Sequence, residues 1–532
     1  MLSRLIALAW LLSALFTLAP DSTAQGGYAK EKYPEHGLTF DLARDYAWLA
    51  IQPTEEWIVL QWVFQERGKR SSEKTSTRSS PKLQIARIDY VADQGPTTPD
   101  ERNPEADTDP EEEVAEKEEP VRHLNSWPRY LERRLSRWDA KEIGKGKERD
   151  GFVPTEYELR IKKGSSATVG WAYVWDQLQE RTFIVMGWCK QGDFDKQVGI
   201  WRKTAEKMRF SEPVPNPDVV KWERFYARRS KFKDPEYRIR VRKSLDGNWE
   251  AEDTENYIII SNTKDQPLVR RIVKDMESIR KEYVKLFPPA GEIKAVSTVR
   301  ICENRDEYFQ YGGPTGSAGY WNWVTEELVL YDGTKREKGK KTDKVDTFIV
   351  LYHEAFHQYI HYSAGKLSPH SWFNEGYGDF FSGAQVKGGK VKRIGSNRWR
   401  VGRIKHAVEV REFTPWKEII HYEQPQYYER SKVGTNYAQG WSMVYFLNTS
   451  KKVQKNELWS QVLTVYFETL KSSWAEGLGE LEAEGKDEDR QQRGAAQLKA
   501  RQAAVEAAFE GIDIDALEAE WILFVNGLEE IR

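Results

Sequence analysis

The stretch that decides how this sequence is interpreted reads Phe348-Ile349-Val350-Leu351-Tyr352-His353-Glu354-Ala355-Phe356-His357. Its apolar residues predict a helix from Val345 to Tyr362. Residues four apart on a helix stand on one face about 5–6 Å apart, so both imidazoles can reach one metal ion while Glu354 lies beside it. Two surface histidines next to an ordinary glutamate are the alternative, which the apolar helix makes less attractive.

A third ligand is expected, because catalytic zinc sites use three protein ligands. The metzincin pattern would need glycine and histidine where this chain has Ile360 and Ser363, which excludes that class. Farther along, a second predicted helix begins with Ser371-Trp372-Phe373-Asn374-Glu375-Gly376. This segment resembles the W-x-N-E-G signature of the gluzincin metallopeptidases, the superfamily of thermolysin and aminopeptidase N.

The resemblance implies a catalytic zinc site. His353, His357 and Glu375 would hold one Zn²⁺ per chain, and the fourth position would stay open to water. Glu354 would be the general base that takes the water proton and later delivers it to the leaving amine. The implied reaction is hydrolysis of peptide bonds. Because the chain lacks a G-x-M-E-N segment, with which aminopeptidases hold the free amine of a substrate, we expect an endopeptidase.

An orienting carboxylate is also implied by the resemblance. Asp379 follows Glu375 in an N-E-x-x-x-D pattern of the thermolysin type. It would accept the second ring N–H of His353, as carboxylates beside zinc-bound histidines commonly do. An exposed helical aspartate is the alternative.

A tyrosine farther along the chain is a candidate for stabilising the oxyanion. The segment Tyr437-Ala438-Gln439-Gly440 resembles the Y-x-x-G segment of aminopeptidase-like gluzincins, in which the phenol stabilises the tetrahedral oxyanion. A tyrosine buried in the core is the alternative for Tyr437. Tyr427 and Tyr428 are weaker candidates for the same task.

The remaining candidates concern substrate binding. A predicted edge strand at Gly319, Tyr320 and Trp321 could pair with an extended substrate by strand addition. His370 could line the substrate cleft. His361 lies one turn beyond His357 and is more often a surface or supporting residue than a ligand.

The predicted elements divide an α+β chain into several parts. Residues 25–211 form a small α+β module, whose order of strands, one helix and a closing Phe210 resembles PsbP-like modules. Residues 212–248 are expected to be a solvated linker. Residues 249–403 would form the sheet half of a peptidase domain with its zinc-binding helices, and residues 404–532 its helical half.

The span from Trp249 to Val525 resembles the peptidase-MA-like proteins, exported bacterial relatives of the gluzincins. In these proteins a strand-rich half precedes the His-Glu-x-x-His helix and a helical half follows. A peptide or protein would be the substrate. The rival hypothesis is a non-catalytic envelope or matrix binding protein with a structural zinc site. The intact Glu354 argues against it, since a structural site has no use for that carboxylate.

Composition removes the usual electrostatic case for nucleic-acid binding, and we expect no nucleic-acid partner. The 532 residues include 81 Lys and Arg against 83 Asp and Glu, a formal net charge of −2, so the excess of positive charge that phosphate binding needs is missing. The 39% of hydrophobic residues suffice for folded cores. Residues 96–120 are the exception: this stretch has eleven acidic residues against two basic ones and almost no apolar side chains, and it is predicted to be a disordered insertion.

The N-terminus predicts export. Arg4 precedes an apolar run from Leu5 to Leu18, and Ser22-Thr23-Ala24 follows, which is typical of a cleavable signal peptide over residues 1–24. An uncleaved anchor is the alternative, but the run is shorter than the roughly 20 residues of a spanning helix. We therefore expect a periplasmic or extracellular protein without a membrane span. Its two cysteines, Cys189 and Cys302, are expected to be buried free thiols.

Overall fold

A computed structural model describes most of the chain. The described residues are 27–49, 51, 57–64, 80–89, 127–161, 167–178, 181–245, 248–289, 291–314, 316–322, 325–333, 344–486 and 489–529. The predicted signal peptide, residues 1–24, and the acidic insertion, residues 96–120, lie outside them. None of the helices in these ranges is long and apolar enough to cross a membrane. The chain divides into two compact units.

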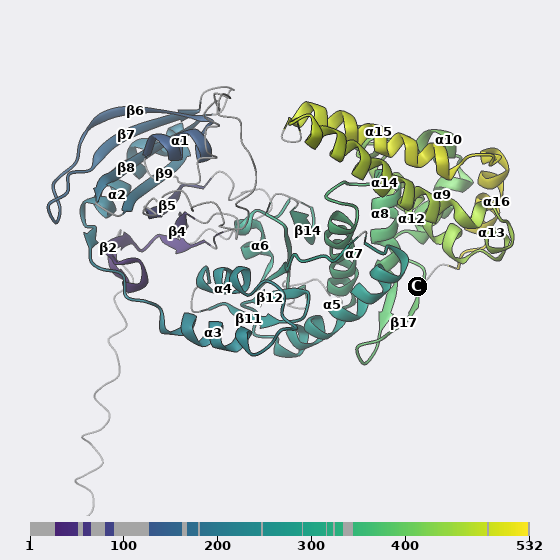
Figure 1. Cartoon of the computed structure of the whole chain (residues 1–532), viewed down its shortest axis with the longest axis horizontal. Helices are drawn as coiled ribbons and strands as arrows, with labels where there is room; N and C mark the ends of the chain where they lie inside the picture. Colours follow the sequence, from purple (N-terminus) through teal and green to yellow (C-terminus); the bar gives the residue numbers. More distant parts are fainter. Residues whose placement is uncertain are drawn as a thin grey trace, which may run out of the picture. The chain divides into compact units, whose positions relative to one another are not determined.

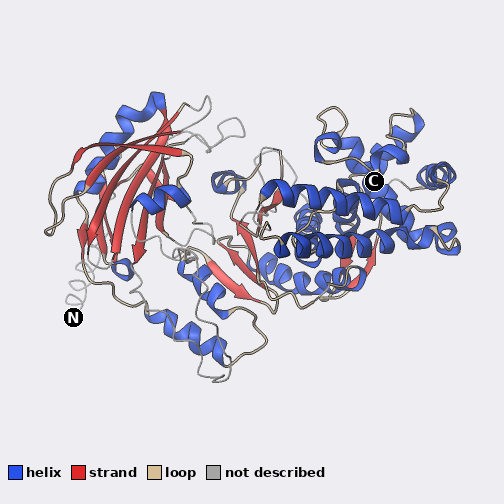
Figure 2. Ribbon diagram, turned by 45° about the horizontal axis from the view of Figure 1, so that its top comes forward, coloured by secondary structure: helices blue, strands red, loops and turns tan. Residues whose placement is uncertain are grey.

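The first unit, Met1–Trp48, Trp57–Lys69 and Ser80–Pro215, is built on a seven-stranded antiparallel sheet (Figure 2). Its strands lie in the order β3 (Tyr46–Trp48), β4 (Ile58–Phe64), β5 (Lys82–Asp89), β9 (Arg181–Lys190), β8 (Thr168–Leu178), β7 (Thr155–Ile161) and β6 (Trp138–Lys145). A smaller sheet joins β1 (Tyr28–Tyr33), β2 (Leu38–Ala43) and β10 (Arg209–Phe210).

Both faces of the seven-stranded sheet are covered by a helix. On β8, Trp171 belongs to the same buried cluster as Trp201 of α2 (Phe194–Glu206). The next residue, Ala172, belongs to a second cluster with α1 (Trp127–Arg134). Because successive side chains of a strand point to opposite faces, the two helices pack on opposite sides of the sheet.

The second unit, Leu49–Glu56, Arg70–Ser79 and Asn216–Arg532, contains a five-stranded mixed sheet. The strand order is β11 (Glu250–Asp253), β12 (Tyr257–Ser261), β13 (Ser297–Cys302), β15 (Glu327–Tyr331) and β14 (Gly319–Asn322). The three central strands are parallel, and each outer strand is antiparallel to its neighbour. Every residue of β12 and β13 is buried, as expected for parallel strands covered on both faces. The predicted strand at 319–321 lies at the edge of this sheet.

The prediction of a linker over residues 212–248 is wrong for most of that stretch. It contains α3 (Pro217–Ala227) and α4 (Pro235–Lys243), and both belong to the second unit. Arg238 is fully buried, and its guanidinium lies 2.9 Å from the carboxylate of Asp253. The basic composition that suggested a solvated segment instead supplies a buried ion pair, which composition cannot distinguish from surface charge.

After α4, the helices of the second unit are, in chain order, α5 (Gln266–Leu286), α6 (Arg305–Tyr311), α7 (Lys344–Ser363), α8 (Ser371–Ser382), then, after the hairpin of β16 (Ala384–Val386) and β17 (Val391–Ile394), α9 (Val401–Glu409), α10 (Trp416–Ile419), α11 (Gln424–Tyr427), α12 (Val433–Thr449), α13 (Lys451–Lys455), α14 (Val462–Ala483), α15 (Arg490–Ala508) and α16 (Ile514–Asn526). All of these helices except α6 contribute residues to one hydrophobic core that includes the sheet. The core runs from Ile259 in the sheet to Trp521 in α16, across the expected boundary at residue 403. The fold is therefore α+β, as predicted. Cys189 and Cys302 are free and buried, also as predicted.

A close helix crossing positions the candidate site. Helices α8 and α12 lie side by side, next to α7 (Figure 1). At their crossing, a Cβ atom on Gly376 would lie only 2.6 Å from the carbonyl oxygen of Gly440, and a Cβ atom on Gly440 would lie 2.9 Å from the carbonyl oxygen of Trp372. Only glycine permits such an approach of two backbones. The crossing brings the start of α12 toward the start of α8.

Candidate metal centre

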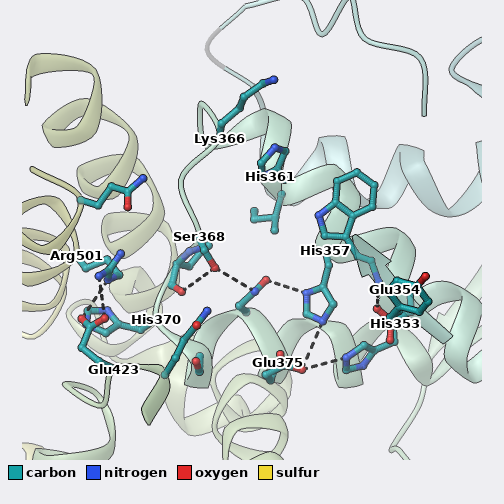
Figure 3. A pocket seen from close by; sticks show the side chains of 18 of the residues that line it. His353, Glu354, His357, His361, Lys366, Ser368, His370, Glu375, Glu423 and Arg501 are labelled. Atoms are coloured by element: carbon teal, nitrogen blue, oxygen red, sulfur yellow. Dashed lines mark hydrogen bonds and ion pairs between the residues drawn. The ribbon is translucent and has the colours of Figure 1, made fainter. Parts of the chain in front are cut away.

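The three predicted ligand side chains converge between α7 and α8. His353 and His357 stand four residues apart on α7 and face Glu375 on α8 (Figure 3). Oε2 of Glu375 lies 3.1 Å from Nε2 of His353 and 3.4 Å from Nε2 of His357. One ligand atom from each of the three residues lies within 4.8 Å of the others.

The donor set and its spacing fit a zinc ion. Two imidazole nitrogens and one carboxylate oxygen are ligands that Zn²⁺ takes in catalytic sites, and bonds of about 2.0–2.1 Å in a tetrahedral site place neighbouring ligand atoms about 3.3 Å apart. The two observed separations lie close to that value. Burial raises the pKa of Glu375, but His357 and His353 lower it well below its usual range. Glu375 is therefore a carboxylate, as a ligand must be.

Each histidine is oriented by a second polar contact. Nδ1 of His353 lies 3.3 Å from Oδ1 of Asp379, and Nδ1 of His357 lies 3.0 Å from Oδ1 of Asn374. Asp379 is 1% exposed, so it is not the surface aspartate of the alternative interpretation. A proton on Nδ1, donated to these oxygens, leaves Nε2 of each ring available to a metal. Burial lowers the pKa of His353, but Asp379 and Glu375 raise it well above its usual value, so a metal ion would have to displace a proton from Nε2.

Asp379 is itself held by two side chains that the sequence analysis missed. Nε of Arg400 donates to its Oδ2 at 2.6 Å, and the amide of Asn397 donates to its Oδ1 at 3.2 Å. The guanidinium of Arg400 also lies 4.9 Å from the ring centroid of Tyr437. Neither Arg400 nor Asn397 belongs to a recognisable motif, so only their packing reveals the contact.

The tyrosine candidates occupy three different environments. Tyr437 lines the cavity beside the ligands, and its ring stacks 6.5 Å from that of His353. Burial, and then the charge of Glu375, raise the pKa of Tyr437 well above its usual value, so its phenol stays protonated and can donate. Tyr428 donates instead to Oε1 of Glu375 at 2.6 Å, a contact that the sequence did not indicate. Tyr427 is fully buried and donates to the carbonyl of Asn436, which makes it a core residue.

The candidate base and the edge strand are in contact in the wall of the cavity. Glu354, Gly319, Tyr320 and Trp321 all line a cavity of about 990 Å³ that includes the three ligands. The backbone N–H of Trp321 donates to Oε2 of Glu354 at 2.9 Å. All four residues therefore lie in the wall of the cavity that also contains the three candidate ligands.

Two further histidines lie outside the ligand cluster. His370 lines the cavity but is 3% exposed, and its Nδ1 lies 2.9 Å from the hydroxyl of Tyr466. His361 lies 3.8 Å from the carboxylate of Glu326. Both histidines thus support neighbouring side chains.

Comparisons with known proteins cover parts of the chain. Residues 347–464, which include the three ligands and Tyr437, match a family described as "Protein of unknown function (DUF1570)". Comparison with curated proteins gave no match. Among solved structures, the chain is similar to the solution structure of cyanobacterial PsbP (CyanoP) from Synechocystis sp. PCC 6803, with 9% identity and a TM-score of 0.23, over 36% of this chain and 96% of that one. A likeness at that level carries no conclusion about this protein.

Proposed function

We propose that this protein is an exported zinc-dependent metallopeptidase, most simply an endopeptidase. The observation that carries the proposal is the cluster of His353, His357 and Glu375 at the wall of a cavity of about 990 Å³, with Glu354 beside it. A structural zinc site is closed by four protein ligands, whereas three ligands that face a cavity suit a catalytic site. This difference favours the enzyme over the binding protein with a structural zinc.

Glu354 would carry the proton transfers. A bound zinc ion supplies a Lewis acid that acidifies water and polarises a carbonyl group. Glu354 would accept a proton from the attacking water and deliver it to the leaving amine. Its hydrogen bond from the N–H of Trp321 already turns the carboxylate toward strand β14.

Strand β14 would bind the backbone of the substrate. It is an edge strand, and the N–H of Trp321 points to Glu354 and the cavity. An extended peptide could pair with the outward backbone groups of Gly319 and Trp321, with the side chain of Tyr320 beside it, which would place a peptide bond near the metal. A peptide or protein is thus the proposed partner, and no nucleic acid is proposed.

Tyr437 and Asp379 would have different roles at the reaction centre. The protonated phenol of Tyr437 would donate to the carbonyl oxygen of the substrate as negative charge develops there. Asp379 would hold His353 in the orientation and tautomer that a metal ligand needs.

The test is substitution of Glu354 by glutamine in the full chain. Glu354→Gln should keep its zinc and its thermal stability but lose about 10²–10⁴-fold in peptide hydrolysis, because an amide cannot take the proton. The exposed Glu412→Gln is the matched control, with activity equal to wild type. Equal nonzero turnover in wild type and Glu354→Gln would refute the mechanism. If wild type cleaves no peptide in a diverse library, the structural zinc protein becomes the better explanation.

A further inference from the structure

The cavity extends beyond the metal centre to a wall formed by helix α15. Arg493, Gln497 and Arg501 of this helix line the cavity. They are spaced four residues apart and therefore form one row on the helix face. All three side chains can donate hydrogen bonds, and two of them are positively charged. The row thus presents a donor-rich surface to the substrate cleft.

Arg501 is held rigidly within this row. Its Nε donates to Oε1 of Glu423 at 3.1 Å and its Nη2 donates to Oε2 at 2.8 Å, so the pair is bidentate. Nε2 of His370 lies 3.6 Å from Oε1 of Glu423 (Figure 3). The other ring nitrogen, Nδ1, lies 2.9 Å from the hydroxyl of Tyr466. Burial, and then the nearby Arg501, lower the pKa of His370 to about 3, so it adds no charge at neutral pH. Fixing a long side chain in advance reduces the entropy that a ligand would have to offset.

Arg501 keeps donors for a ligand. A guanidinium has five N–H groups, and Glu423 accepts two of them. The Nη1 group has no hydrogen-bond partner among the described residues, although the side chain is 15% exposed. Two Nη1 protons and one Nη2 proton thus remain for the cavity.

The charges that line the cavity favour an anionic group at this wall. The cations are Lys366, Arg493 and Arg501, and the carboxylates are Glu326, Glu354, Glu375 and Glu423. A divalent ion at the metal centre makes the sum positive. Lys366 lies 2.6 Å from Glu326, and two of the other carboxylates lie at the metal centre. At the α15 wall the charged lining residues are Arg493, Arg501 and Glu423, and Glu423 leaves part of the Arg501 guanidinium available to the cavity.

The distance from the metal suits a peptide substrate. His370, which contacts Glu423, stands five residues before Glu375, a separation of about 7–8 Å along the axis of α8. A peptide in extended conformation advances about 3.3 Å per residue. The side chains of Glu423 and Arg501 add to this separation. A substrate group that contacts Arg501 would therefore lie roughly two to four residues from the scissile bond.

We propose that Arg501, with Gln497 and Arg493, forms a subsite for a carboxylate group of the substrate. This inference rests on the proposed peptidase function and names its substrate class: peptides with a carboxylate two to four residues from the cleaved bond. The carboxylate can be an acidic side chain or the C-terminus of the peptide. A bidentate contact of guanidinium with carboxylate has the geometry that arginine suits best.

Binding to the zinc-loaded Glu354→Gln protein tests the subsite without hydrolysis. The probes are N-acetylated octapeptides that differ only in Glu against Gln at each position in turn, or in a C-terminal acid against an amide. One pair should show about tenfold tighter binding of the acid by calorimetry, the scale of a hydrogen bond to a charged group in a wet site. The pair that shows it identifies the source of the carboxylate. Equal affinity within every pair would overturn the inference.

The arginine is then removed in the same background. Arg501→Gln should reduce the preference for the acid to about onefold, whereas Lys499→Gln, an exposed cation on α15 outside the cavity, should preserve it. Because Arg501→Gln leaves Glu423 without its ion pair, Arg501→Gln/Glu423→Gln is measured beside it and should behave alike. A lower Tm with an unchanged preference would mean that Arg501 is only a structural ion pair, which overturns the inference. If the preference disappears as expected but wild type cleaves no peptide, the proposed peptidase function fails while the subsite stands.

Discussion

Replacing Gly376 with alanine tests how the packing of α8 on α12 builds the site. The new Cβ atom would lie 2.6 Å from the carbonyl oxygen of Gly440 and 2.7 Å from Cγ2 of Val444, where ordinary contacts begin at 3.4 Å. The helices would therefore have to separate by about 0.8 Å, and overpacking of this kind costs about 1–3 kcal/mol. Alanine also favours the helix by about 1 kcal/mol over glycine. A control variant must therefore measure this gain separately from the cost of the clash.

Gly479→Ala supplies that correction. Gly479 lies on helix α14, and a Cβ atom there would meet nothing within 4 Å, so this variant gains helix propensity without a clash. The two variants should differ by about 1–3 kcal/mol in the free energy of unfolding, or several degrees in Tm at about 2–4 °C per kcal/mol. Calorimetry of the full chain measures both.

The same displacement should lower turnover while sparing the metal. The three ligands lie on α7 and α8, whereas Tyr437 lies on α12, one turn before Gly440. Gly376→Ala should therefore keep its zinc but lose roughly 10- to 100-fold in kcat, because a misplacement near 1 Å can cost about 10²-fold. If Gly376→Ala were as stable as Gly479→Ala and retained wild-type kcat, the close crossing would have no role in the site.

The remaining predictions address individual side chains. His353→Ala, His357→Ala and Glu375→Ala should each lose the zinc by elemental analysis, because each removes one of three ligands; full retention by Glu375→Ala would move the third ligand elsewhere. Tyr437→Phe should lower kcat by about 10²–10³-fold with little change in KM or zinc content. Tyr428→Phe should instead weaken zinc affinity by about 10–100-fold, because it loses the hydrogen bond to Glu375. If Tyr437→Phe weakened zinc affinity and Tyr428→Phe lowered kcat, the two tyrosines would have each other's role. In the folded chain the pKa of His370 is lowered to about 3. Below pH 6.5 the His370 side chain is therefore protonated in the unfolded chain but still neutral in the folded chain. Stability relative to His370→Gln should therefore fall as pH decreases from about 6.5 toward 3 in thermal melts, and a constant difference over that range would show that His370 titrates normally.

The sequence alone located the features that depend on local chain geometry. The spacing of His353 and His357 puts both rings on one face of any helix that contains them, and the predicted helix, 345–362, differs from α7 by one residue at each end. The buried parallel strands of the second unit have continuous apolar runs such as Tyr257-Ile258-Ile259-Ile260, which a sequence pattern indicates, whereas the charged outer strand β11 has no such run. Even the third candidate ligand, Glu375, was indicated by a short segment at the start of one helix, through its resemblance to the W-x-N-E-G signature.

Only the tertiary structure decided which distant side chains join the site. The contact of Tyr428 with Glu375, the double contact of Arg400, and the row on α15 that ends at Arg501 involve separate elements. The relation between these elements depends on how helices pack, and no periodicity along the chain encodes it. The same holds for Arg238. The sequence suggested that it lies in a solvated segment, but in the structure it is buried in an ion pair with Asp253. Local pattern determines which face of an element a residue occupies, and the close packing of the core determines what that face meets.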